Sequence, residues 1–348
     1  MVDNKEVTED NRMLMQQKSM EKTVLFAKKG LVVAVFAAML WGIYGVLMDL
    51  AYGLEPLTAT GYNILVIPLA ACVLEEYAAS IILFIRNIKN GKVKEYTRTF
   101  RTKPGKIICV GGILGGVLGI SGSMAAILYC GPAYALSITA LYPVIGALCS
   151  VIFLKEKTNI RFWGGFACCI IGGVVIGFTP PEGMASERFY MGIIFAVLAC
   201  FAWGIEGVLA GFGTDTVDSD VGVGLRVMTA GTTALILLIF IPGGIELLVL
   251  CVTRHITTVA AIFCVAIFSA LSTAYWYKAF GMTGVSRAMA CNSTYGLWSI
   301  LFSAILSVCG VVDFTLTGYL IAGATIMVIG IVLVVANPRE LIQLRKLS

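Results

Sequence analysis

The stretch Cys200-Phe201-Ala202-Trp203-Gly204-Ile205-Glu206-Gly207-Val208-Leu209 decides how this chain folds. It is apolar apart from one carboxylate, Glu206, which stands one helical turn after Trp203. Such a stretch is typical of a membrane-crossing helix. An ionisable side chain there is costly and usually serves a cation, a proton or a pore.

Length and composition place the chain among membrane proteins. The 348 residues are 59% hydrophobic and 13% charged, and the mean hydropathy is +0.92. Apolar runs of about 20 residues recur, the length needed to cross a hydrocarbon core of about 30 Å. These runs are continuously apolar, whereas the strands of a transmembrane β-barrel alternate apolar and polar residues. The sequence therefore predicts an all-α integral membrane protein in a lipid bilayer.

Charge, cysteine and histidine content argue against several kinds of site. The net charge of +5 follows the loops between the apolar runs, so no nucleic-acid partner is expected. The 11 cysteines form no C-x-x-C pair and there is one histidine, so we predict packing cysteines, no metal site and no cofactor. No nucleophile, acid and base gather as an enzyme requires, so the chain is predicted not to be an enzyme.

The apolar runs divide the chain into ten spans between two polar tails. Residues 1–29 form the first tail, which lacks the apolar core and cleavage site of a signal peptide, and residues 337–348 form the second. A shorter run around 241–252 is broken by Pro242-Gly243-Gly244 and is predicted to be re-entrant or interfacial. The predicted spans are 30–53, 57–85, 106–130, 133–154, 159–178, 189–212, 220–242, 257–280, 287–309 and 314–336.

The distribution of lysine and arginine gives an orientation. With a cytoplasmic N-terminus, the loops after the second, fourth and eighth spans and the C-terminal tail hold most of the basic residues on the cytoplasmic side. Arg188 and Arg254 fall outside, and Arg226 falls within a span. The bias predicts a multi-pass protein with both termini in the cytoplasm.

The chain repeats itself. Residues 38–47 in the first span match 200–209 in the sixth, which aligns Trp41 with Trp203 and Tyr44 with Glu206. Around the fourth and ninth spans, Gly131 to Ser150 parallels Gly284 to Ser303 and pairs Tyr142 with Tyr295. Five spans per repeat is an odd number, so the halves 30–178 and 189–336 must insert with opposite orientations. Inverted repeats of this kind build secondary transporters, whose substrate site lies near the midplane between the halves.

Aromatic residues in three spans accompany Glu206. Trp41 with Tyr44, Trp203 with Glu206, and Tyr295 with Trp298 are each three residues apart, so both members of a pair share one helix face. Aromatic rings together with a carboxylate bind organic cations, above all quaternary ammonium groups, through the ring quadrupoles. Interfacial anchoring or helix packing is the alternative for each ring, and a structural ion pair with Arg226 is the alternative for Glu206. The candidate substrate-binding residues are Trp203, Glu206, Tyr295, Trp298, Trp41, Tyr44 and, one turn before Tyr295, Asn292.

Further charged residues lie in or beside the spans. Glu75 and Glu76 point about 100° apart on a helix and cannot both line one site. We expect them on a solvated face near the cytoplasmic end of the second span, with a proton relay as the alternative. Arg226 is expected near the cytoplasmic start of the seventh span, snorkelling or paired with the acidic loop before it. Asp49 is interpreted as an end charge near the outer side, or one that attracts cations.

Two five-span repeats that each open with a Trp-Gly pair resemble the drug/metabolite transporter superfamily of EamA type. The fourth span adds Leu141-Tyr142-Pro143-Val144 and ends in Leu154-Lys155-Glu156-Lys157, both of which recur in that superfamily. Within it, the chain most resembles bacterial choline-uptake permeases of the lic-operon type. That likeness rests on residues 202–208, on residues 140–143, and on residues 292–302, which resemble an Asn-x-Ser-Tyr-x-x-Trp run with Thr294 in place of the serine.

The resemblance implies an aromatic box around a trimethylammonium group, with Glu206 as its counter-charge. It assigns the box to Trp203, Tyr295 and Trp298, with Trp41 and Tyr142 as further candidates. The favoured hypothesis is a secondary transporter that imports choline or a related quaternary amine by alternating access. An exporter of amino acids or other small metabolites is the alternative, and a non-transporting scaffold or sensor is a third. Proton coupling through Glu75 or Glu206 stays open, as does the oligomeric state.

Overall fold

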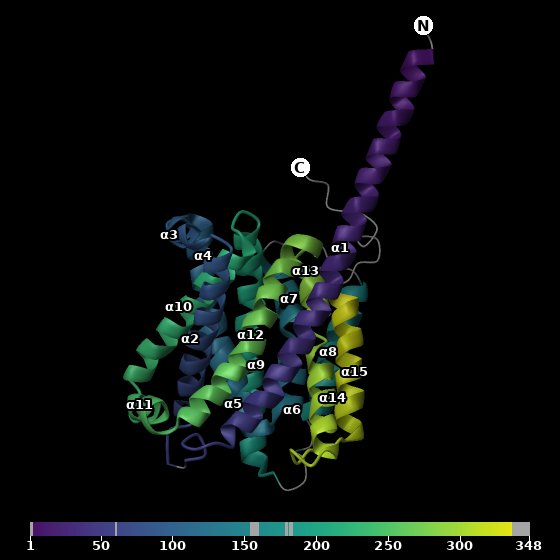
Figure 1. The fold of residues 1–348 in the computed structure, drawn as a ribbon. Helices are drawn as coiled ribbons and strands as arrows, with labels where there is room; N and C mark the ends of the chain where they lie inside the picture. The colour runs from purple at the N-terminus through teal and green to yellow at the C-terminus, as the bar shows by residue number, and fades with distance from the viewer. Residues whose placement is uncertain (1–2, 60, 154–159, 178–179, 181–183, 336–348) are drawn as a thin grey trace.

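The computed structural model is a bundle of roughly parallel helices, from one end of which the first helix protrudes (Figure 1). It describes residues 3–59, 61–153, 160–177, 180 and 184–335. Within these residues every regular element is helical, which confirms the all-α prediction. The predicted tail 337–348 and the stretch 154–157 quoted above lie outside the described residues.

The described chain forms fifteen α-helices and one π-helix, η1. Helices α4, η1 and α5 follow one another without a break. The elements are α1 (Asp3–Tyr52), α2 (Val66–Lys89), α3 (Val93–Phe100), α4 (Lys103–Gly112), η1 (Ile113–Ile120), α5 (Ser121–Cys130), α6 (Pro132–Thr139), α7 (Tyr142–Phe153), α8 (Ile160–Gly177), α9 (Ser186–Thr214), α10 (Ser219–Ile239), α11 (Gly244–Arg254), α12 (Ile256–Thr283), α13 (Val285–Asn292), α14 (Tyr295–Val308) and α15 (Gly318–Val335).

Eight helical segments of the described chain are long and apolar enough to cross a membrane. Two further apolar helices, Trp163–Gly177 and Gly318–Leu333, are shorter. The predicted count of ten spans is therefore not confirmed, although an apolar helix lies at each predicted position. The second predicted span, 57–85, begins only at Val66 and runs on to Lys89, because Gly53, Pro56 and Gly61 keep the chain before it in turns.

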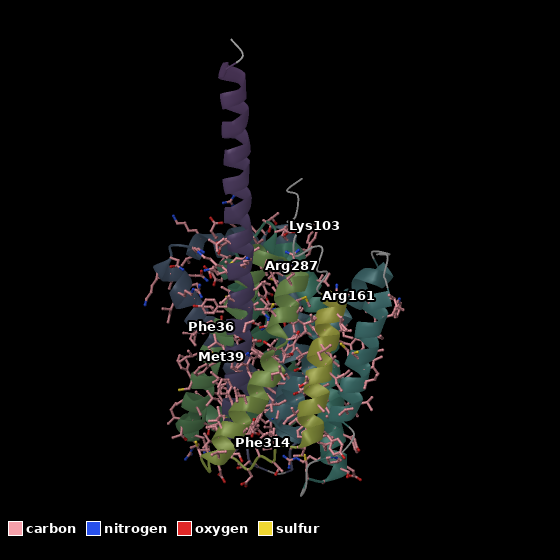
Figure 2. All side chains as sticks on the ribbon, turned by 90° about the vertical axis from the view of Figure 1, so that its right-hand side faces the viewer. Phe36, Met39, Lys103, Arg161, Arg287 and Phe314 are labelled. Atoms are coloured by element: carbon pink, nitrogen blue, oxygen red, sulfur yellow. The ribbon has the colours of Figure 1, made fainter. Side chains whose placement is uncertain are left out.

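Basic side chains gather at one end of the bundle. Figure 2 shows Lys103, Arg161 and Arg287 toward the end from which α1 protrudes, and Phe314 toward the opposite end. Helix α15 also finishes at the α1 end (Figure 1). This arrangement follows the lysine and arginine asymmetry of the sequence.

Two of the membrane-crossing rods are interrupted near the middle of the bundle. Helix α6 gives way to α7 after Ala140 and Leu141, and α13 gives way to α14 after Ser293 and Thr294. Both rods also begin alike, because Gly131 and Gly284 precede them with φ of 80° and 87°, a conformation that glycine adopts without steric cost. The interruptions place Tyr142 and Tyr295 at the first residues of α7 and α14.

Candidate functional site

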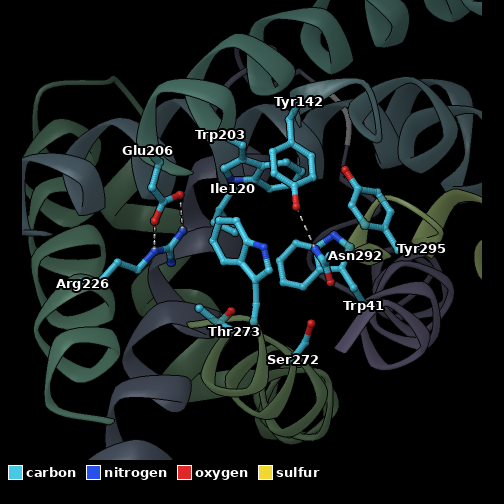
Figure 3. Close-up of a pocket in the computed structure, with 11 residues that line it drawn as sticks. Trp41, Ile120, Tyr142, Trp203, Glu206, Arg226, Ser272, Thr273, Asn292 and Tyr295 are labelled. Carbon is cyan, nitrogen blue, oxygen red and sulfur yellow. Dashed lines mark hydrogen bonds and ion pairs between the residues drawn. The ribbon is translucent and has the colours of Figure 1, made fainter. Parts of the chain in front are cut away.

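A cavity lies inside the bundle where α1, α9, α12 and the two interrupted rods meet (Figure 3). Its free volume is about 30 Å³, enough for one or two water molecules in this conformation. Figure 3 shows Glu206 and Arg226 on one side and Tyr142, Asn292 and Tyr295 on the other. The lining residues are Trp41, Ile120, Tyr142, Trp203, Glu206, Arg226, Ser272, Thr273, Trp276, Asn292 and Tyr295.

Most of the predicted substrate-binding residues line this cavity, but two do not. Tyr44 is fully buried and stacks on Trp41, with ring centroids 4.4 Å apart. Trp298 is half-buried and stacks on Phe302 at 6.1 Å. The backbone of α14 at Trp298 lies so close to Gly42 that a Cβ there would be 2.6 Å from the Trp298 Cβ. Both residues therefore support the cavity wall from behind.

The aromatic rings of the cavity come from both halves of the chain. Trp41 and Trp203 meet edge to face at 5.5 Å. Tyr142 stacks near Tyr295 at 6.3 Å and meets Trp276 edge to face at 5.8 Å. These separations fall in the range of favourable aromatic pairs, so the rings hold one another in place.

Hydrogen bonds fix the orientation of several rings. Tyr142 Oη donates to the Met289 carbonyl at 3.3 Å and accepts from Asn292 Nδ2 at 3.2 Å. Tyr295 Oη donates to Thr139 Oγ1 at 3.1 Å. In contrast, Trp41 Nε1 and Asn292 Oδ1 are buried without a hydrogen-bond partner among the described residues. Buried polar groups are rarely left unpaired, so these two atoms suit a bound ligand or water.

The carboxylate of Glu206 forms part of a buried ion cluster. Arg226 Nε and Nη2 donate to the two Glu206 oxygens at 2.7 and 3.3 Å, and Arg226 Nη1 donates to Glu76 Oε1 at 2.7 Å. Tyr277 Oη adds a hydrogen bond to Glu206 at 3.3 Å. Arg226 is 3% exposed, Glu76 1% and Glu206 0%. The ion pair named as the alternative for Glu206 is therefore present.

The expected position of Arg226 was wrong. Lys92 and Arg86 occupy the acidic residues of the loop, with ion pairs to Asp218 and Asp220 at 2.8–3.0 Å. Arg226 stands two helical turns further along α10, about 10 Å from its start, and faces inward. A buried guanidinium must be paired, and the two glutamates supply its partners.

The solvated face expected for Glu75 and Glu76 was also wrong, because both side chains are fully buried. Helix α2 packs against α10 on one side and α12 on another, and these helices cover both side chains. The two side chains diverge as expected, since Glu76 meets Arg226 and Glu75 does not. Neither Glu75 oxygen has a hydrogen-bond partner among the described residues. The Ser269 hydroxyl of α12 is near this carboxyl group without reaching ordinary hydrogen-bond geometry.

Glycines of the π-helix η1 make room for the site. A Cβ at Gly115 would overlap the Glu206 carboxylate, and a Cβ at Gly119 would overlap the Trp203 indole. Trp203 Nε1 donates to the Gly115 carbonyl at 3.0 Å. π-Helical turns are frequent at functional sites, and here one brings a bare backbone against the two residues of the opening stretch.

Helix α12 forms one wall of the cavity, and the sequence pattern did not predict it. Ser272, Thr273 and Trp276 line the cavity, and Ser272 Oγ ties α12 to α1 through the Ala37 carbonyl at 2.8 Å. The available signal was the aromatic run Tyr275-Trp276-Tyr277, which lies inside the predicted span 257–280.

Asp49 lies in a second, wider cavity toward the end of the bundle opposite the protruding part of α1. Its volume is about 870 Å³, and Arg188 and Asp313 also line it. The interpretation of Asp49 as a simple end charge is incomplete, because Asp49 lines this cavity.

Comparison with known proteins assigns the chain to a family. The sequence profile of the EamA-like transporter family matches residues 28–178 and 190–336. Protein LicB of Haemophilus influenzae is 29% identical over 189 residues, a match that spans 54% of this chain and 63% of that protein. A solved crystal structure of a protein superposes with a TM-score of 0.58 at 19% identity, covering 90% of this chain and 99% of the other, which shows the fold alone. The profile match across both halves establishes that the chain belongs to the EamA-like transporter family, multi-pass membrane proteins of the drug/metabolite transporter superfamily.

Proposed function

We propose that this protein is a secondary transporter that moves a small organic cation, choline or a related quaternary amine, across a bacterial plasma membrane by alternating access. The observation that carries the proposal is the cavity in the middle of the bundle, where Trp41, Tyr142, Trp203 and Tyr295 surround a space bordered by Glu206. A quaternary ammonium group donates no hydrogen bonds, so ring faces and a nearby anion are what bind it.

The charges around the cavity also favour a cation. Arg226 balances only one of its two carboxylate partners, so the cluster of Glu76, Arg226 and Glu206 keeps one negative charge in excess when its members are ionised.

The proposed topology is ten spans in two inverted five-helix repeats, 30–178 and 189–336, with both termini cytoplasmic. The family profile matches two segments that nearly coincide with these halves. Both halves carry one interrupted rod, and the pairs Trp41 with Trp203 and Tyr142 with Tyr295 meet in the cavity. Interrupted helices at corresponding positions of two repeats are the usual mark of a substrate site.

An inside-negative membrane potential contributes about 2.3 kcal/mol per charge per 100 mV, which is enough to drive cation entry without a coupled ion. We retain Glu75 as the candidate proton relay, because its buried carboxyl group lacks a partner. Glu76, the other candidate, is engaged by Arg226.

Export of amino acids or other small metabolites is the second candidate function. Arg226 lines the cavity, and a guanidinium group is a strong partner for the carboxylate of an amino acid. Glu206 and Glu76 already occupy Arg226, so an amino acid would have to compete with both.

Binding to the purified protein tests the proposal. We expect choline and tetramethylammonium to bind by isothermal titration calorimetry, with affinity lowered roughly tenfold or more in Trp203→Ala and Tyr295→Ala. Trp163→Ala, on the exposed side of α8, is the control and should bind as the wild type does. Tight binding of amino acids with no effect of choline would overturn the choice of substrate, and equal choline affinity in the two cavity variants would overturn the site.

A further inference from the structure

The cluster of Glu206, Arg226 and Glu76 has a role beyond holding α2, α9 and α10 together. We propose that Arg226 is an internal cation that occupies Glu206 while the cavity is empty, and that an entering organic cation displaces it onto Glu76. This inference rests on the proposed transport of a cation, and it assigns Arg226 as the residue that sets the affinity and permits the empty protein to change conformation.

The geometry gives Arg226 two anchors of unequal strength. It makes two hydrogen bonds to Glu206, at 2.7 and 3.3 Å, and one to Glu76, at 2.7 Å. A carboxylate accepts up to about four hydrogen bonds, so Glu76 has the capacity to receive the guanidinium in full. The Nη1 contact keeps Arg226 attached to Glu76 while the contacts to Glu206 are exchanged for a substrate.

Two glycines of η1 pack directly against the cluster. A Cβ at Gly115 would overlap the Glu206 carboxylate, and a Cβ at Gly116 would overlap Ala230 of α10 and lie 3.5 Å from Glu76 Oε1. These two adjacent glycines of η1 therefore face the two carboxylates in turn. No side chain of η1 therefore stands between the two carboxylates.

The charge balance matches one monovalent cation. With one arginine and two glutamates, the cluster has a single excess negative charge when all three are ionised, which one quaternary ammonium group neutralises. A bare buried carboxylate is costly, so an empty site needs a substitute cation. Arg226 supplies this cation, which allows the substrate-free protein to change back to the conformation that takes up the next substrate. Tyr277 Oη remains on Glu206 in both arrangements and keeps the carboxylate oriented.

Two substitutions are expected to change choline affinity in opposite directions. Arg226→Gln removes the competitor for Glu206, so the dissociation constant for choline at pH 8 should fall about tenfold. Glu76→Gln removes the charge that receives Arg226 but keeps the shape of the side chain, so the dissociation constant should rise about tenfold. Glu246→Gln, which changes an exposed glutamate of α11, is the matched control and should bind as the wild type does. A purely structural cluster would weaken binding in both variants.

Transport in proteoliposomes gives an independent readout. Arg226→Gln should retain choline exchange but lose net uptake at least tenfold, because only net uptake requires the empty protein to return. Equal loss of exchange and net uptake, or affinity changes of the same sign in both variants, would overturn the inference while leaving choline as the substrate. If Arg226→Gln does not fold, an unchanged or lowered dissociation constant in Glu76→Gln overturns it alone. Absence of choline binding to the wild type would instead overturn the proposed function and this inference with it.

Discussion

The rings of Tyr142 and Tyr295 lie 6.3 Å apart with their planes only 14° from parallel. These tyrosines are the residues that the sequence pairs between its two halves, as it pairs Trp41 with Trp203, which meet at 5.5 Å. Equivalent residues of two halves come into contact only where they lie close to the axis that relates the halves. Both contacts therefore support a substrate site at the junction of the proposed repeats.

Two substitutions of Tyr142 separate the contribution of its ring to choline affinity from that of its hydroxyl group. Tyr142→Ala removes the ring and should weaken choline binding about tenfold, since a desolvated cation–π contact contributes up to about 2 kcal/mol. Tyr142→Phe keeps the ring and loses only the hydrogen bonds with Met289 and Asn292, so its affinity should fall no more than threefold. Calorimetric titration measures both, with Tyr319→Ala on the exposed face of α15 as the control. Equal losses in the two variants would show that the ring is not in the site.

Apolar run length and glycine placement predicted much of the fold. The spans follow from hydrophobicity alone, and the glycines at 131 and 284 begin the two interrupted rods at matching points of the repeats. Aromatic spacing found most of the cavity wall because the pairs share helix faces. It misplaced Trp298, since a helix face that is suited to a cavity is equally suited to packing against Gly42.

Charge positions were harder to predict, because the burial of one helix depends on its neighbours. The sequence of α2 taken alone predicts Glu75 and Glu76 near water, but α10 and α12 cover both residues in the structure. The sequence suggests Arg226 as the partner of the loop aspartates because it does not show that Lys92 is close to them. In the structure, the connection after α2 brings Lys92 to Asp218, and the two form an ion pair. Long-range pairing of this kind leaves no periodic signal in a single sequence.

Gly115 is a sharp test of how the site is packed. Gly115→Ala places a methyl group on the Glu206 carboxylate, so it should break the Arg226 pairing, destabilise the protein by roughly 1–3 kcal/mol and abolish measurable choline binding. Gly164→Ala in α8 is the matched control, because a Cβ there meets nothing within 4 Å. Thermal unfolding in detergent with and without choline measures both effects. Wild-type behaviour of Gly115→Ala would mean that Glu206 is not held against η1.

Asp218 links the start of α10 to the connection after α2. It caps the helix by accepting hydrogen bonds from the backbone N–H groups of Asp220 and Val221 and pairs with Lys92. Partial burial opposes its charge, but the hydrogen bond and attraction from Lys92 outweigh this and hold the pKa of Asp218 below its ordinary value. The stability that its charge contributes is therefore present above about pH 4 and is lost as the pH falls through the lower folded-state pKa.

Two variants separate the cap from the charge. Asp218→Asn keeps a good N-cap and should lose well under 1 kcal/mol at pH 7, because the ion pair is partly exposed. Asp218→Ala should lose about 1 kcal/mol more. The difference between wild type and Asp218→Asn in thermal unfolding should shrink as the pH falls from 7 to 3. A difference that grows toward low pH would reverse the sign and refute the assignment.

Glu75 is the test of proton coupling. Its carboxyl group is fully buried without a hydrogen-bond partner in the described part of the chain, where an ionised carboxylate would be very costly, so we expect it to carry a proton in this conformation. Glu75→Gln imitates that form and should therefore fold, bind choline and support uptake driven by a membrane potential. Accumulation driven by an imposed pH gradient at zero potential should disappear, and so should choline-induced alkalinisation of the external medium. Proteoliposomes with a pH-sensitive dye measure both, beside Glu246→Gln as the control. If Glu75→Gln still accumulates choline on a pH gradient, the proton travels by another group or the transport is not proton-coupled through α2.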